Sequence, residues 1–140
     1  MKSLICLFGL LFTLTAQAAP AVGGNPCQDP GATVTFVTGA TSTTSSTQIV
    51  ALVATQRIFL CSVDIWGVSG TNPTFSLQYG TGTNCASGAT VIVPAFATVA
   101  ATFYQPVNGW GPYTAPGTEL CYLDGGASPI ENYLISYVQQ

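Results

Sequence analysis

The chain has 140 residues, of which 48% are hydrophobic and only 5% are charged, and its formal net charge is -3. This length suits one domain, and the 2 Lys and Arg residues exclude a nucleic-acid surface, because phosphate binding needs clustered basic side chains. Histidine is absent, which removes the commonest general base and the commonest metal ligand. Because the chain has so few charges, electrostatic repulsion between neighbouring molecules is weak, and the composition therefore favours self-association.

The first 18 residues have the pattern of a secretory signal peptide. Lys2 precedes an apolar run over residues 4–14, and residues 16–18 form a small-x-small cleavage site. The run is roughly 11 residues long, whereas about 20 are needed to span a bilayer. We therefore predict cleavage and an exported, extracellular or particle-bound protein, with a retained hydrophobic anchor as the alternative. Residues 19–31, rich in Pro and Gly, are predicted to be a linker or strap, which leaves residues 32–140 for the folded domain.

Residues 57–85 are predicted to form two strands and the turn between them, and the rest of the chain to cover this hairpin. In the first strand one set of alternating side chains is assigned to the core face: Phe59, Cys61, Val63 and Ile65. In the second, the apolar members of a period-2 pattern are Phe75, Leu77 and Tyr79. Residues 68–73 supply Gly and Pro for the turn.

The remaining predicted strands are short and separated by turn residues. They cover residues 32–37, 48–54 (expected to be buried on both faces), 89–93, 118–123 and 130–138, while residues 97–104 are ambiguous between helix and strand. About eight strands without a clear helix predict an all-β protein, an antiparallel β-sandwich of the jelly-roll or Ig-like kind.

Signal cleavage would leave four cysteines: Cys27, Cys61, Cys85 and Cys121. An even number in an exported chain predicts two disulfides, and four cysteines allow three pairings, among which the sequence does not choose. Buried free thiols are the alternative. Metal binding by these cysteines is disfavoured because no CxxC or Cys/His spacing occurs.

The sequence contains few residues of the types that catalysis requires. The carboxylates are interpreted as solvated charges, with Asp124 before Gly-Gly as a turn residue, although an acid pair for glycoside hydrolysis can be drawn from Asp64, Glu119, Asp124 and Glu131. Ser or Cys nucleophiles lack a histidine base, and no GxSxG motif is present. We predict no enzyme and no cofactor; calcium binding by loop carboxylates is left open.

Aromatic residues are the positive signal for binding. Trp110 and Tyr113 lie in a Gly/Pro loop, where binding residues often occur, and Trp66 ends a predicted strand. Such rings can stack on sugars or contact another subunit; the alternative is that they fill the core or anchor the loop.

The strands also carry a recurrent motif set: an aromatic-x-Cys strand at residues 59–61, Tyr-Gly-Thr-Gly-Thr-x-Cys at residues 79–85, Leu-Cys at residues 120–121 and Tyr-Val-Gln at residues 137–139. With these motifs, residues 49–140 resemble small β-rich proteins of tailed phages and prophages. The resemblance implies a virion-associated structural protein, such as a head decoration, fibre or tail accessory protein. The signal-like start departs from that pattern and fits a protein that crosses a membrane. The expected function is therefore a non-catalytic structural or adhesive protein whose partners are its own copies or other particle or surface proteins, with a secreted carbohydrate-binding module as the alternative.

Overall fold

The computed structural model describes residues 24–98, 101–104 and 111–140. The predicted signal peptide and the first part of the strap lie outside these residues. Six strands and two short 3-10 helices are present in the described part, within these bounds: η1 Pro26–Gln28, β1 Thr35–Thr41, β2 Thr47–Val50, β3 Ile58–Thr81, η2 Thr83–Cys85, β4 Ser87–Ala97, β5 Ala101–Tyr104 and β6 Glu119–Gln139. The chain is therefore mostly antiparallel β-structure, as predicted, although six long and short strands replace the expected eight.

Two very long strands organise the sheet. β3 has 24 residues and β6 has 21, and they pair with each other antiparallel from Ile58↔Gln139 to Gly80↔Glu119. β1 and β2 pair with β6, whereas β4 and β5 pair with β3. Every other strand of the described sheet therefore attaches to one of these two.

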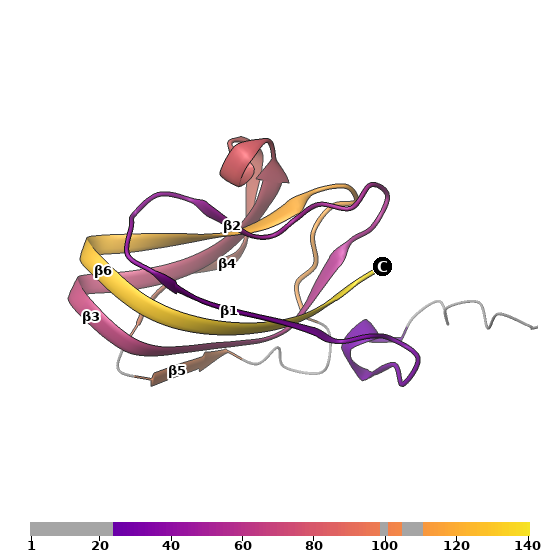
Figure 1. Ribbon diagram of the computed structural model, residues 1–140, viewed down its shortest axis with the longest axis horizontal. Coiled ribbons are helices and arrows are strands. Elements are labelled where there is room, and N and C mark those ends of the chain that lie inside the picture. Colours follow the sequence, from indigo (N-terminus) through magenta and orange to yellow (C-terminus); the bar gives the residue numbers. More distant parts are fainter. Residues whose placement is uncertain (1–23, 99–100, 105–110) are drawn as a thin grey trace, which may run out of the picture.

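β3 and β6 bend together, so that the sheet folds back on itself (Figure 1). One layer holds β1, the second half of β6, the first half of β3 and β5; the other holds β2, the first half of β6, the second half of β3 and β4. The predicted hairpin in residues 57–85 is thus wrong: its two strands are halves of β3 that lie in different layers and pair with β6. The strands predicted at residues 118–123 and 130–138 are present, but as the two halves of one long strand, β6.

Glycines permit the bend. Gly70 and Gly126 adopt φ values of 110° and 96°, which L side chains rarely adopt. A Cβ on Gly126 would lie 2.5 Å from the carbonyl oxygen of Asn72, and one on Gly70 would lie 2.6 Å from that of Ser128. The turn residues of the sequence therefore carry two paired strands from one layer to the other, and no side chain fits between their backbones.

We expect Gly126→Ala to destabilise the protein by about 3 kcal/mol or more, because it combines an unfavourable φ with a collision against backbone. Gly88→Ala is the matched control: its φ of 63° is also positive, but nothing lies within 4 Å of the position that its Cβ would occupy. That control should cost only about 1–2 kcal/mol. Urea denaturation of both variants measures the difference, and equal losses would contradict the steric account.

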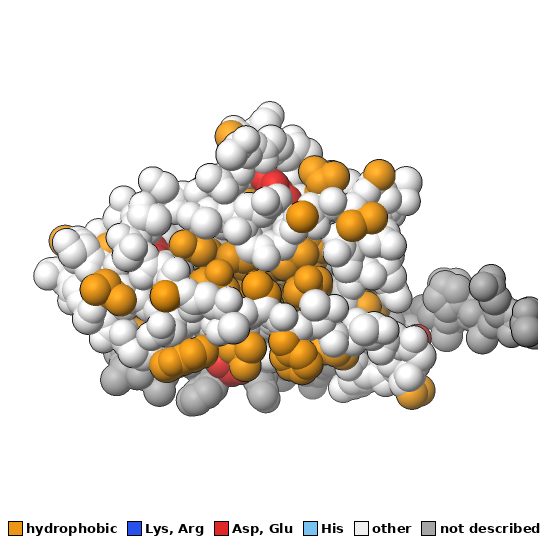
Figure 2. All heavy atoms as spheres, viewed as in Figure 1, with side chains coloured by type: hydrophobic (Ala, Val, Ile, Leu, Met, Phe, Trp, Pro, Cys, Tyr) orange, Lys and Arg blue, Asp and Glu red, His pale blue; other side chains and the backbone are white. Residues whose placement is uncertain are grey.

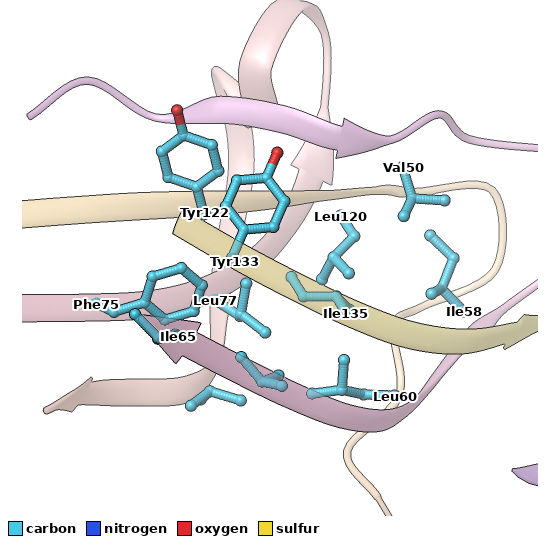
Figure 3. Close-up of a cluster of buried hydrophobic side chains, with 12 residues drawn as sticks. Val50, Ile58, Leu60, Ile65, Phe75, Leu77, Leu120, Tyr122, Tyr133 and Ile135 are labelled. Atoms are coloured by element: carbon cyan, nitrogen blue, oxygen red, sulfur yellow. The ribbon is translucent and has the colours of Figure 1, made fainter. Parts of the chain in front are cut away.

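The core lies between the two layers. Figure 3 shows side chains from both halves of β3 and β6 pointing toward one another, among them Ile65, Phe75, Leu120 and Ile135. Phe75 and Leu77 are fully buried, as their alternation predicts, but Tyr79 is only half-buried, and Ser76 and Gln78 on the opposite face are buried as well. Tyr122 and Tyr133, from opposite halves of β6, meet with ring centroids 5.5 Å apart. Each fully buried side chain of this size contributes roughly 1.5–3 kcal/mol, which makes this contact between layers the main stabilising feature.

Half of the residues predicted for the core face of the first strand do not face the core, because β3 contains a β-bulge. Leu60 pairs with Tyr137 and Ser62 pairs with the adjacent Ser136, so Cys61 is an extra residue in β3. The extra residue reverses the parity: Val63 and Ile65 are buried as predicted, but before the bulge Ile58 and Leu60 face the core instead. Phe59 and Cys61 therefore lie on the outer face, half-buried.

Two further strand predictions need adjustment. The segment 48–54, expected to be buried on both faces, contributes only β2, and Leu52 and Val53 beyond it are 43% and 44% exposed. The ambiguous segment 97–104 contains a strand, β5. β1 begins three residues later than predicted and extends into the expected Thr/Ser loop.

Candidate functional site

The four predicted cysteines form two disulfides, Cys27–Cys61 and Cys85–Cys121. The first ties the strap to the bulge of β3, and the second ties η2 to β6. Cys85 and Cys121 are buried, and the carboxylate of Glu119 beside them accepts hydrogen bonds from the Cys85 backbone N–H and the Gln48 side chain. The two sulfurs and this carboxylate lie within 4.8 Å of one another, but sulfurs bonded to each other offer no thiolate to a metal.

Tyr113 lies on the outer face of β3 and is 49% exposed. Its ring centroid is 5.6 Å from that of Phe59, and the Arg57 guanidinium carbon is 5.3 Å from it on the ring face. The loop is held there by backbone hydrogen bonds from Leu60 to Pro112 and from Thr114 to Ile58, each 3.0 Å long. The result is a fixed aromatic surface, since stacking and a cation–π contact orient the ring.

The other aromatic candidates do not join this surface. Trp66 is 42% exposed, but it lies seven positions along β3 from Phe59, which is about 23 Å at the strand rise. Trp66 and Tyr113 therefore do not form one surface. Trp110 lies outside the described residues.

The positions of two carboxylates differ most from the sequence interpretation, which placed them in solvent. Asp124 and Glu131 are only 2% and 0% exposed, so they are not solvated loop charges, and Asp124 is not in a turn. Both lie on core-facing positions of β6: Asp124 shares its parity with Leu120 and Tyr122, and Glu131 shares its own with Tyr133. That shared parity is the sequence signal that would have placed them inside.

Burial perturbs both acids. It raises the pKa of Asp124 to about 6; the Thr41 hydroxyl lowers this pKa and the Glu131 carboxylate raises it. The Thr41 hydroxyl lies near this carboxylate, but the two groups do not have the geometry of a hydrogen bond. Burial also raises the pKa of Glu131, partly offset by the hydrogen bond that the Thr98 hydroxyl donates to it. The two carboxyl groups are thus close enough to interact, but a glycan cannot reach them while they are buried.

The raised pKa values predict a stability that falls as the pH rises. Asp124 loses its proton near pH 3.8 in the unfolded chain and near pH 6 in the folded chain. Between these values the folded state binds more protons, so the free energy of unfolding decreases with increasing pH and stays lower above pH 6. For Asp124 the decrease is at most about 3 kcal/mol, and Glu131 acts in the same direction.

Urea denaturation at pH 4 and pH 7 in metal-free buffer measures this effect, with Asp124→Asn as the control. The variant should lose most of the difference between the two conditions. A wild type whose pH dependence matches that of the variant would contradict the prediction.

Comparison with models of known families, with curated proteins and with solved structures finds no match for this chain. Among the described residues, no helix has the length and apolar character needed to cross a membrane.

Proposed function

We propose that the protein is an exported, non-catalytic structural or adhesive component that assembles with further copies of itself or on the surface of a particle. We also class the folded-back sheet as an antiparallel β-sandwich, the architecture that jelly-roll and Ig-like domains share. Two disulfides support export into an oxidising compartment. The motif resemblance to phage and prophage proteins supports a particle-bound role.

The observation that carries the proposal is the placement of charge in the sheet. β1, β2, β4 and β5 each have a single neighbour among the described strands, so each presents an unpaired edge. None of the four contains a charged residue, whereas β3 and β6 at the centre contain all the charges of the sheet. Soluble proteins usually place charges on edge strands to prevent pairing with other chains; this molecule does the opposite.

β1 is the edge best suited to pairing. It has seven residues in unbroken register with β6 and contains no proline. β4 contains Pro94 and three register irregularities, and β2 and β5 have four residues each; proline, bulges and shortness all protect an edge. Phe36 on β1 is 65% exposed, and Figure 2 shows hydrophobic side chains at the surface in a band between β1 and β2. A second copy that pairs β1 with β1 would continue the layer symmetrically.

Size-exclusion chromatography with light scattering tests this assembly. The wild type should associate as its concentration rises, and Phe36→Lys should prevent association because a charge on the edge opposes strand pairing. Val91→Lys is the matched control: Val91 is 54% exposed on the protected edge β4, so this variant should associate like the wild type. A wild type that stays monomeric at high concentration, or equal effects of both variants, would overturn the proposal.

A secreted carbohydrate-binding module is the second candidate, favoured by the half-exposed Tyr113 ring held between Phe59 and Arg57. A glycan array with wild type, Tyr113→Ala and Trp110→Ala tests it. Specific binding that either variant loses would support the module, and no binding above background would remove it.

A further inference from the structure

A polar cluster lies buried inside the fold near the bend. Its members are Thr41 at the end of β1, Thr98 after β4, and Asp124 and Glu131 on the two halves of β6; we call it the buried acidic cluster. Thr41 and Glu131 are directly paired across β1 and β6. Thr98 is fixed by a hydrogen bond from its backbone N–H to the Pro73 carbonyl, 3.0 Å long, and its hydroxyl donates to one oxygen of Glu131.

Four oxygens of the cluster have no hydrogen-bond partner among the described residues: both carboxylate oxygens of Asp124, the second oxygen of Glu131 and the hydroxyl of Thr41. Buried polar groups are nearly always paired, and an unpaired buried charge is far more costly than a neutral group. Each of the four atoms has under 1 Å² of accessible surface, so bulk water does not pair them either.

Among the described residues, no basic side chain neutralises the two acids. The whole sequence contains only two, Lys2 and Arg57. Arg57 lies against Tyr113 and donates a hydrogen bond to the Thr114 carbonyl, next to the start of β3. Asp124 and Glu131 lie near the bend, at the opposite end of the first half of β3. Among the described residues, the compensating charge therefore does not come from a basic side chain.

We propose that the buried acidic cluster binds a divalent cation, with calcium as the ion that its donors suit best. All the unpaired atoms that could act as metal ligands are oxygens, which favour hard cations over zinc or copper. Two carboxylates match a charge of +2. The four unpaired oxygens supply part of the six to eight ligands that calcium takes, and water or backbone carbonyls complete such sites.

The cation would clamp the fold at its bend. Asp124 precedes the bend in β6 and Glu131 follows it, so one ion held by both would join the two layers, and Thr41 would add β1. This inference does not depend on the proposed assembly function.

Tyrosine-sensitised terbium luminescence tests the site, because terbium replaces calcium at oxygen sites and Tyr133 lies two residues from Glu131 on the same face of β6. The protein is refolded with terbium present, since the cluster is closed to solvent. We expect sensitised emission at pH 7 that calcium displaces, and a melting temperature that is higher in calcium than in chelator. Asp124→Asn and Glu131→Gln should each lose the emission and the calcium-dependent rise in melting temperature.

Asp64→Asn is the matched control, since Asp64 is a half-buried carboxylate of the same sheet outside the cluster; it should retain both signals. The proposal is overturned if folded wild type binds neither ion, or if Asp64→Asn abolishes binding as well. It is also overturned if acid stabilises the protein while calcium has no effect at any pH, since protons alone would then neutralise the pair.

Discussion

Replacing Cys85 and Cys121 together by alanine is expected to destabilise the protein by about 4 kcal/mol. The disulfide closes a loop between residues 36 positions apart, and the cost of closing such a loop in the unfolded chain grows with its length. Both cysteines are buried, and the backbone N–H of Cys85 donates to the buried Glu119 carboxylate. Without the bridge, η2 would have to keep this contact by hydrogen bonding alone. Guanidinium denaturation of the oxidised wild type and the variant measures the loss.

The Cys27–Cys61 bridge provides a direct comparison, because its separation of 34 residues gives almost the same loop entropy. Its cysteines are half-buried, and it fastens a strap that supplies no strand to the sheet. Its removal should therefore cost less than removal of Cys85–Cys121. The opposite order would show that the strap stabilises the domain more than η2 does.

Phe75→Ala is expected to destabilise the protein by about 4 kcal/mol, because truncation of a buried aromatic side chain loses transfer free energy and leaves a cavity. Phe75 is completely buried in the second half of β3, and its ring centroid lies 6.3 Å from that of Tyr122 and 6.0 Å from that of Phe96. Urea denaturation measures the loss.

Val91→Ala is the control, since truncation of a side chain that is 54% exposed and lies outside the proposed association edge should change stability by less than about 0.5 kcal/mol. A Phe75→Ala variant no less stable than this control would contradict the placement of the core between the layers.

Local patterns predict the strands of this protein well, and long-range pairing poorly. Alternation identifies residues 74–79 as a strand with Phe75 and Leu77 inside, because period-2 burial is encoded in neighbouring residues. Gly70 and Pro73 signal a change of direction equally well whether a chain turns within a sheet or crosses between layers. The sequence therefore could not show that β3 pairs with β6 on both sides of the bend.

The bulge and the buried acids escape prediction for different physical reasons. The extra residue at Cys61 reverses which side chains face the core in the part of β3 that precedes it. Nothing in the amino-acid composition signals this bulge. Glu131 is assigned to solvent by its charge, and Asp124 by its charge and by the Gly-Gly that follows it; exposure is the usual outcome for carboxylates. Their position in the alternation of β6 argued the other way, and here the pattern outweighs the residue type. The disulfides were predicted in number, but their pairing depends on the fold.

The position of β6 in the chain has a consequence for how the protein is made. It supplies a central strand to both layers and follows every other strand in sequence. During synthesis neither layer can close until residues 119–139 have emerged, because β1 and β2 have no other partner in the described sheet. The nascent polypeptide thus keeps β1 and β2 unpaired until its last strand arrives, which is compatible with the export proposed above.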